Sequence, residues 1–377
     1  MNEKTLRVAA EVIGQAGRER PADAVLRETL KREGLSQETS REISQLVFAF
    51  YRWRGWLNSA EPLFDNLKAA WALVEEFLQQ PESFSDEELL SKAVPDWTKE
   101  QVEISSAWTR SLQEEPRLWL RAKRGTAETV MRKLGSSQVT QNAFLPCALD
   151  YRGEEDLFRT PEFHTGEFEL QDISSQAVSV VCDPRACETW WDACAGEGGK
   201  LLHLSDLMEN KGLIWASDRA AWRLKNLKRR TARARVFNYR AVPWDGGAKL
   251  PTKNKFDGVL VDAPCSGIGT WQRNPHARWT TTLADVLELA EIQKRLLQHV
   301  SVSVKPGGKL FYSVCTLSRA ETVEVAETFS RLFPDFQPCS MKNPFRPTDA
   351  PKPMLWFWPQ DCGGNGMFVA AWQKSGG

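Results

Sequence analysis

Apolar residues recur at helical spacing through the first part of the chain. Between Thr5 and about Leu78 they stand three or four positions apart, which is the period of a helix with one buried face. The stretch from residue 81 to residue 96 is polar and carries Ser, Asp and Pro, so it interrupts this pattern. We predict a bundle of helices that ends near these residues, with a core formed by Leu6, Ala9, Ala10, Ile13, Ala24, Leu26, Leu30, Ile43, Leu46, Val47, Phe50 and Trp53.

The pattern changes further along the chain. Residues 117–123 and 163–170 alternate as strands do, and residues 127–134 have a helical period, which indicates a small α/β unit. From about Thr165, short β-rich runs alternate with longer helices, as in a parallel sheet that is covered on both faces. The predicted strands are residues 190–195, 213–217, 235–239, 256–261 and 309–314, and the helices between them include residues 220–233 and 282–304.

Composition limits the class of protein. A chain of 377 residues is longer than one core commonly supports, so two or three domains are expected. Hydrophobic residues make up 42% and charged residues 26%, which is typical of globular proteins and excludes wholesale disorder. No apolar run approaches the ~18 residues of a membrane helix, and charges interrupt the N-terminal segment, so we expect a cytoplasmic protein without membrane association.

Charge and cysteine usage narrow the choice further. The 49 Lys and Arg residues balance the 49 Asp and Glu residues, so a polyanionic partner would have to be held by a local basic patch. The eight cysteines include no C-x-x-C pair, and the four histidines have no ligand spacing. We therefore expect neither a disulfide framework nor a metal site.

A glycine-rich stretch provides the first candidate chemistry. Residues 192–200, DACAGEGGK, follow a predicted strand and open a helix, where glycines allow close backbone approach and the helix offers free N–H groups. Asp218 ends the next strand, where a carboxylate can accept from both ribose hydroxyls. Together they indicate a nucleoside site, although the loop alone is equally compatible with a simple tight turn. The loop residues in question are Cys194, Ala195, Gly196, Glu197, Gly198, Gly199 and Lys200.

Two cysteine stretches follow two later strands. Residues 262–267 read DAPCSG and residues 312–317 read YSVCTL, so both lie at the carboxyl edge of the predicted sheet, beside the glycine loop. Thiolates are strong nucleophiles, and the carboxylate of Asp262 can bind an amino group or a protonated ring nitrogen. The set suits covalent attack on an electron-poor heterocycle. Each of Cys265 and Cys315 taken alone also fits a small buried apolar residue.

At these motifs the chain resembles the RsmB-like (Nol/Nop/Sun) family of S-adenosylmethionine-dependent RNA cytosine-5 methyltransferases. The resemblance rests on FELQDISSQAV, DACAGEGGK, Asp218, DAPCSGIGTWQRNPHARW, YSVCTLSRAE and GMFVAA, in this order. EISQLVFAFYRWRGWLN resembles the end of the NusB-like domain of bacterial members, and VPDW with EPRLWLRAK resembles their linking subdomain. The resemblance implies a NusB-like helical RNA-binding domain at 1–90, a small α/β linking subdomain at 95–164 and a Rossmann-like class I methyltransferase domain at 165–377.

The resemblance also implies roles for individual residues. Cys315 would attack carbon 6 of cytosine, Asp262 would bind the ring, and Cys265 would assist product release, with Lys200 fixing the cofactor and the Asp262 carboxylate. The cofactor would be S-adenosyl-L-methionine, bound by residues 194–200, Asp218, Asn238 and Asp262. The chain departs from the family where Glu197 replaces Pro, Leu201 and Val314 replace Thr, and Asn238 replaces Asp.

The implied partner is RNA. Ribosomal RNA is favoured, transfer RNA is the alternative, and we expect a monomer. Nine basic residues and no acidic one lie between Arg219 and Trp244, so this segment either neutralises phosphates or is a solvated helix face. Among the 16 tryptophans, Trp271 is the one that we consider for substrate contact.

Three other functions compete with this one. A methyltransferase could use the same cofactor on another acceptor, and an RNA-binding assembly factor could keep the fold without activity. The presence of Cys315, Asp262 and Lys200 counts against the inactive factor. A DNA cytosine methyltransferase is disfavoured because the Glu-Asn-Val motif of those enzymes is absent.

Overall fold

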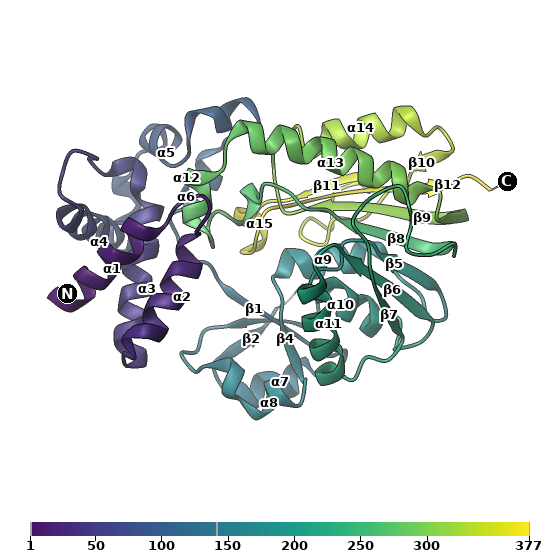
Figure 1. Cartoon of the computed structure of the whole chain (residues 1–377), viewed down its shortest axis with the longest axis horizontal. Coiled ribbons are helices and arrows are strands. Elements are labelled where there is room, and N and C mark those ends of the chain that lie inside the picture. The colour runs from purple at the N-terminus through teal and green to yellow at the C-terminus, as the bar shows by residue number, and fades with distance from the viewer. Residues whose placement is uncertain (1, 141, 377) are drawn as a thin grey trace. The chain divides into compact units, whose positions relative to one another are not determined.

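The protein, seen in a computed structural model, packs as two compact units. The structure describes residues 2–140 and 142–376. One unit joins Met1–Pro116 with Thr270–Asp285, and the other joins Arg117–Gly269 with Val286–Gly377. The chain therefore leaves the second unit after the first cysteine motif and returns to it within a long helix. Figure 1 shows both units with their elements labelled.

The first unit is helical, as the spacing of apolar residues predicts. Helix α3 shows why, because Ile43, Leu46 and Val47 lie on one face and are buried. Ser36 caps this helix by accepting a hydrogen bond from the backbone N–H of Thr39 at 3.2 Å. The helices are α1 (Glu3–Gln15), α2 (Ala22–Glu33), α3 (Gln37–Arg52), α4 (Leu63–Gln79), α5 (Asp86–Lys92), α6 (Ser106–Ser111) and α12 (Pro275–Thr280).

A buried arginine ties the later segment, Thr270–Asp285, to these helices. Arg278 is fully buried and donates to the backbone carbonyls of Arg52, Ala93 and Leu112 at 3.2, 3.0 and 3.0 Å. Burial lowers the pKa of Arg278 to about 9. Because these acceptors extend to residue 112, the packed unit continues past the boundary that we predict near residues 81–96.

Trp271 belongs to the same helical core. Its ring is fully buried and stacks on Trp108, with centroids 6.4 Å apart, while Trp97 meets it edge-on. An indole enclosed in this way has no face left for a nucleotide base. The expectation that Trp271 contacts substrate is therefore wrong, and its role is packing.

The second unit contains a small antiparallel sheet. Its strands β1 (Leu118–Ala122), β2 (Ser137–Val139), β3 (Ala148–Tyr151) and β4 (Phe168–Leu170) lie in the order β2-β3-β1-β4. Helix α7 (Ala127–Leu134) has the predicted limits. The predicted strand at 163–170 is shorter than expected, because Thr160 caps helix α8 (Pro161–His164) and delays the strand to residue 168.

The larger sheet confirms the predicted Rossmann-like α/β class. Five parallel strands run β9-β8-β5-β6-β7, and β12 pairs antiparallel with β9. Figure 1 shows α10 and α11 on one side of this sheet and α13 and α14 on the other. The strands are β5 (Thr189–Asp192), β6 (Leu213–Asp218), β7 (Tyr239–Pro243), β8 (Phe256–Asp262), β9 (Val304–Val314), β10 (Phe336–Pro338), β11 (Met354–Phe357) and β12 (Met367–Lys374). The helices are α9 (Ile173–Cys182), α10 (Gly199–Leu207), α11 (Ala221–Ala234), α13 (Leu283–Ser301), α14 (Val323–Leu332) and α15 (Pro359–Cys362).

Strand β7 begins four residues later than predicted. Arg235, at the predicted start, has φ 58° and caps α11 instead, because its N–H bonds back to the carbonyl of Ala232. Pro243 pairs with Asp218, so the carboxyl end of β7 lies at the same sheet edge as Asp218. The residues that follow Pro243, and not those near 238, are therefore the ones delivered to that edge.

Candidate active site

A cavity of about 650 Å³ lies at the carboxyl edge of the large sheet. Residues that follow β5, β6, β7, β8 and β9 line it, which is where open α/β sheets bind ligands. The volume is within the range of small-molecule and cofactor sites. The predicted site residues among its walls are Cys194, Ala195, Gly196, Glu197, Gly199, Lys200, Asp218, Asp262, Cys265 and Cys315.

Glycine geometry shapes the loop between β5 and α10. Gly196 and Gly198 have φ of 55° and 85°, a region that suits glycine. A Cβ on Gly198 would also come within 2.9 Å of the Leu227 side chain. Gly198 is the N-cap of α10 and is not among the residues that line the cavity, so the structure gives it a role in the shape of the loop.

Asp218 holds this loop in place. One of its oxygens accepts from the backbone N–H of Gly196 at 3.0 Å, and the other accepts from the N–H of Ala220 at 2.8 Å. The residue is 6% exposed and faces the cavity. A carboxylate fixed in this way still has lone pairs for two further donors, which is what a ribose would supply.

The unusual Glu197 has a structural partner. Asn226 of α11 donates to its carboxylate at 3.1 Å, and Arg230 donates to its backbone carbonyl at 3.2 Å. The carboxylate therefore fastens the glycine loop to α11. This interaction accounts for an acidic residue at a position where the family resemblance leads us to expect Pro.

Asn238 is not brought to the cavity, so its expected cofactor contact is wrong. Its amide oxygen accepts from the Ser205 hydroxyl at 2.6 Å and its NH₂ donates to the Lys211 carbonyl at 3.2 Å, beside the amino end of β7. Asp245, which follows β7 at the other end, does line the cavity. Sequence reasoning missed Asp245 because the strand was placed four residues too early.

Lys200 and Asp262 form an ion pair inside the cavity. The Lys200 Nζ lies 2.6 Å from Oδ2 of Asp262, and the Ser313 hydroxyl donates to Oδ1 of the same carboxylate at 2.7 Å. Burial acts to lower the pKa of Lys200, but the Asp262 carboxylate outweighs it and raises that pKa. The ammonium therefore stays charged, and the carboxylate is held in one orientation from both sides.

The two cysteines meet at the end of the same cavity. Their Sγ atoms are 3.4 Å apart, so one thiol donates a hydrogen bond to the other sulfur. This bond lowers the pKa of Cys315 and raises the pKa of Cys265. Burial and the charge of Asp262 act to raise the pKa of Cys315, and the charge of Lys200 acts to lower it, but the bond from Cys265 is the largest influence and the pKa falls. Cys315 is thus the thiol favoured as thiolate, and Cys265 is the thiol favoured as proton donor.

A buried carboxylate braces the two cysteine loops. Glu321 is fully buried and accepts from the backbone N–H of Ser266 at 2.8 Å, next to Cys265. It also accepts from the hydroxyl of Ser266. The hydroxyl of Thr316, which is next to Cys315, donates to it at 3.2 Å. Gln293 of α13 donates to it at 3.0 Å. Glu321 is the last residue of the motif YSVCTLSRAE. Its spacing of three residues after Ser318 was the local sequence feature that could have pointed to it.

Asp192, at the end of β5, is a buried carboxyl group close to the charged carboxylate of Asp262. It is 1% exposed, and neither of its oxygens receives a well-formed hydrogen bond among the described residues. Burial, followed by the nearby charge of Asp262, raises its pKa to about 8. Asp192 is therefore protonated at neutral pH, and a further negative charge beside Asp262 is avoided.

Residues 2–140 and 142–376, which the structure describes, lack two further kinds of feature. No helix there combines the length and the apolar character that a membrane span requires. No group of three or more His, Cys, Asp or Glu side chains within residues 2–140 and 142–376 is arranged to hold a metal ion.

Comparison with known proteins identifies the family. Residues 179–373, just over half of the chain, match the family described as 16S rRNA methyltransferase RsmB/F. The chain is 33% identical over 320 residues to a probable ribosomal RNA small subunit methyltransferase B of Synechocystis sp.. That alignment covers 79% of this chain and 71% of the relative. The chain belongs to the RsmB/F methyltransferase family, as the motif resemblance predicts.

Further relatives agree with this assignment. A probable ribosomal RNA small subunit methyltransferase B of Bacillus subtilis is 36% identical over 221 residues, which are 57% of this chain and 49% of the relative. The chain spans about half the length of this relative. Among solved structures, one titled "Crystal Structure of PH0851" has a TM-score of 0.81 at 23% identity and covers 99% of both chains. That likeness confirms the fold.

Proposed function

We propose that this protein methylates carbon 5 of a cytosine in ribosomal RNA, with S-adenosyl-L-methionine as methyl donor. The observation that carries the proposal is the pair of thiols 3.4 Å apart in a cavity that also holds the glycine loop and the Lys200–Asp262 pair. A simple nucleoside-binding turn does not require two cysteines with opposite pKa shifts. Ribosomal RNA is favoured over transfer RNA because the relatives are named for the ribosomal small subunit.

The cavity fits the proposed cofactor. Asp218 has lone pairs for ribose hydroxyls, Asp245 borders the same side, and the loop at residues 194–200 approaches with its backbone. S-adenosylmethionine, when bound, supplies a methyl group from a sulfonium centre. Neutral Asp192 and the charged Lys200 would then face its amino acid portion without adding net negative charge.

The chain's own residues account for activation of the base. The Cys315 thiolate forms a bond to carbon 6 of cytosine, which moves an electron pair toward carbon 5 and makes that carbon nucleophilic. Asp262, held by Lys200 and Ser313, binds the ring nitrogen and amino group while the adduct exists. After methyl transfer, a water molecule takes the proton from carbon 5, and the electron pair of that C–H bond re-forms the double bond between carbons 5 and 6. The bond from sulfur to carbon 6 then breaks, and Cys315 leaves as a thiolate that the Cys265 thiol stabilises by donating a hydrogen bond.

The position of Cys315 in the wall of the cavity also constrains the substrate. A paired cytosine in an RNA helix cannot reach Cys315, so the target base must be unpaired or flipped out of its helix. We further propose that residues 1–90 form the RNA-presenting helical module that the motif resemblance implies. A methyltransferase acting on another acceptor remains the competing function, and it would not need the Cys315–Cys265 arrangement.

Bisulfite sequencing of total RNA tests the proposal. RNA from cells with the gene should contain at least one ribosomal cytosine that resists conversion, and RNA from cells lacking the gene should not. The wild-type gene should restore the protection, and a Cys315→Ala gene should not. Protection found only in transfer RNA would support the alternative substrate. Identical profiles in all RNA classes, with methyl transfer by the purified protein to another acceptor, would overturn the proposal.

A further inference from the structure

Helix α11 carries a set of basic side chains that the fold does not use. Trp222, Lys225, Lys228 and Arg229 lie three or four residues apart and are exposed, so they form one solvent-facing stripe. Among the described residues, Lys225, Lys228 and Arg229 make no ion pair. No acidic residue stands anywhere between Arg219 and Trp244.

Two arginines of the same helix form ion pairs within the fold. Arg230 and Arg233 point to the packed side and pair with the buried carboxylate of Glu169 at 3.0 and 2.6 Å. Arg233 also lies over the ring of Phe163, 3.7 Å from its centroid. The helix thus separates cations that hold the fold from cations that face solvent. A solvated helix face needs some charge, but it does not need a complete absence of acidic residues.

Exposed aromatic rings flank this basic stripe. Trp222, in the first turn of α11, is 58% exposed, and Phe237, just beyond the helix, is 76% exposed. The Arg223 guanidinium lies 5.4 Å from the centroid of the Trp222 ring. Cations interleaved with exposed aromatic rings are the combination that binds single-stranded nucleic acid, because rings stack on bases and cations neutralise phosphates.

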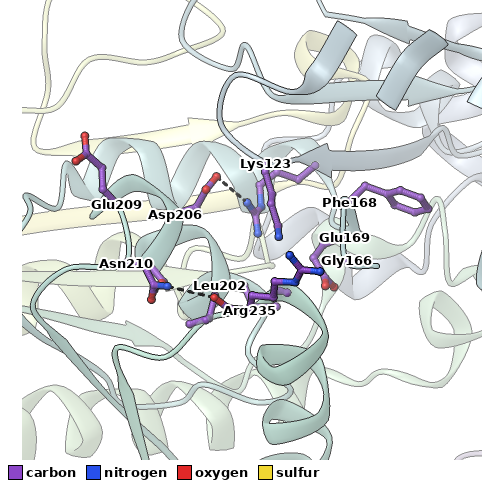
Figure 2. Close-up of a pocket in the computed structure, with 13 residues that line it drawn as sticks. Lys123, Gly166, Phe168, Glu169, Leu202, Asp206, Glu209, Asn210 and Arg235 are labelled. Atoms are coloured by element: carbon purple, nitrogen blue, oxygen red, sulfur yellow. Dashed lines mark hydrogen bonds and ion pairs between the residues drawn. The ribbon is translucent and has the colours of Figure 1, made fainter. Parts of the chain in front are cut away.

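The two ends of the helix connect the stripe to two hollows. Arg219, Trp222 and Arg223 line the candidate active site at the amino end. A second hollow of about 190 Å³ at the carboxyl end is lined by Arg235 and Lys123. Figure 2 shows these two side chains pointing toward one another across it. The 14 residues of α11 separate the two hollows by roughly 20 Å at 1.5 Å per residue.

Two of the cations that line the second hollow are available for an anion. Its three lining carboxylates already have partners, since Asp206 binds Arg121 at 3.3 Å, Glu209 binds Lys211 at 2.9 Å, and Glu169 binds the α11 arginines. Lys123 and Arg235 make no ion pair among the described residues, and burial together with the charge of Arg235 lowers the pKa of Lys123. Nearby carboxylates act on Lys123, but none of them lies within ion-pair distance of it or of Arg235 among the described residues, so a phosphate group could bridge the two cations.

We propose that α11 is the track along which single-stranded substrate RNA enters the active site, with Trp222 stacking on a base, Lys225 and Arg229 on phosphates, and Lys123 with Arg235 holding a phosphate at the far end. This inference rests on the proposed RNA substrate. It names the surface that binds the strand next to the target cytosine.

Salt-dependent binding measurements test the track. The full chain is titrated with a single-stranded RNA of about ten nucleotides and with a duplex of the same sequence, over a range of KCl concentrations. The Lys225→Glu/Arg229→Glu protein should bind the single strand at least tenfold more weakly, and its salt slope should fall by about 0.7 for each lost phosphate contact. Its KM for RNA should rise while kcat at saturating RNA and affinity for S-adenosylmethionine stay unchanged.

A matched control separates local contacts from general charge. The Lys253→Glu/Arg331→Glu protein changes the net charge equally at two exposed cations of the same unit that lie outside α11. It should bind RNA within about twofold of wild type, since its charges lie away from the track. Trp222→Ala should weaken binding about tenfold, and Trp222→Phe should recover most of that loss because a phenyl ring still stacks. Lys123→Gln should weaken binding of the RNA of about ten nucleotides, and it should not change binding of a trinucleotide.

The outcomes separate this inference from the function on which it rests. Equal losses in the α11 variant and the control variant would overturn the track, even if the wild-type protein methylates RNA. Weakened duplex binding with unchanged single-strand binding would overturn the single-strand assignment. A wild-type chain that binds S-adenosylmethionine but neither binds nor methylates any RNA would overturn the proposed function itself.

Discussion

The two sides of the active-site cavity are built in different ways. The nucleoside side consists of the loop at residues 194–200 with Asp218 and Asp245, and it uses backbone N–H groups and single carboxylates. The thiol side consists of Asp262, Cys265, Cys315 and Glu321, and it uses buried side chains that hydrogen-bond one another. Loss of one contact on the nucleoside side should weaken binding in steps. Loss of one group on the thiol side should disable the chemistry, because its partners depend on it.

The largest effect should come from Cys315. We expect Cys315→Ala to abolish methyl transfer and to form no covalent RNA complex, since no thiolate remains to activate carbon 5. Cys265→Ala should still attack and transfer the methyl group, but release should stall and leave a complex that survives denaturing electrophoresis. A stable complex formed by Cys315→Ala and none by Cys265→Ala would mean that the two roles are exchanged.

The same pair of variants tests the hydrogen bond between the thiols. Cys265→Ala removes the donor that lowers the pKa of Cys315, so that pKa should rise. The rate of alkylation of Cys315, followed by peptide mass mapping, should then reach its half-maximum at a higher pH than in the wild type. An unchanged pH profile would show that the contact between the sulfurs does not set the reactivity of Cys315.

The next largest effect should come from Glu321. Glu321→Gln replaces an acceptor that serves Ser266, Thr316 and Gln293 with a group that has one fewer acceptor oxygen. We expect kcat to fall on the order of a hundredfold, because misplaced catalytic groups are costly, while affinity for S-adenosylmethionine changes little. Glu324→Gln, at an exposed carboxylate three residues on, is the control and should retain wild-type kcat. Equal kcat in both variants would exclude a bracing role for Glu321.

Asp218 should give a graded loss. Each lost hydrogen bond is worth roughly 1 kcal/mol, so Asp218→Ala should weaken affinity for S-adenosylmethionine by about ten- to a hundredfold in calorimetric titration. Asp245→Ala should weaken it less, because Asp245 makes no contact with the loop. Asn238→Ala should lower thermal stability by removing its bonds to Ser205 and Lys211, and it should leave cofactor affinity unchanged. A cofactor defect in Asn238→Ala with none in Asp218→Ala would reverse this assignment.

The smallest effect concerns Asp192, which lies between the two sides. The native state holds a proton on this carboxyl up to a pH of about 8, whereas an unfolded Asp releases it near its ordinary pKa of 3.8. Stability should therefore fall as the pH rises from about 4 through 8. Asp192→Asn carries no such proton, so its melting temperature should match the wild type below pH 4 and exceed it by a margin that grows up to about pH 8. Parallel melting curves across this range would contradict the raised pKa.

Sequence reasoning predicted the sheet, the glycine loop and both cysteine motifs, because each lies in a strand or turn with a strong local signal. It failed at Asn238 because Arg235 takes a left-handed helix cap that its residue type does not announce. Val236 and Phe237 then looked like strand residues, and the true edge residue, Asp245, was passed over. A four-residue error in a strand moved a carboxylate from one end of the sheet to the other.

Side-chain networks were the second kind of limit. The bracing role of Glu321 depends on Ser266 and Gln293, which are distant in sequence, so no local pattern reveals it. The prediction that Trp271 contacts substrate failed for the same reason, since the burial of its ring depends on Trp108. Glu197 seemed anomalous until Asn226 of α11 appeared beside it.

The helical unit consists of two segments of the chain, and the ribosome synthesises more than 150 residues of the second unit between them. Its first part, through Pro116, emerges early, but Trp271 and Arg278 are synthesised only after most of the second unit's sheet strands. At about 5–20 residues per second, the delay is on the order of ten seconds. During that interval the carbonyls of Arg52, Ala93 and Leu112 lack the hydrogen bonds from Arg278, and Trp108 lacks its contact with the Trp271 ring. The core of the helical unit can therefore close only after translation has passed residue 278.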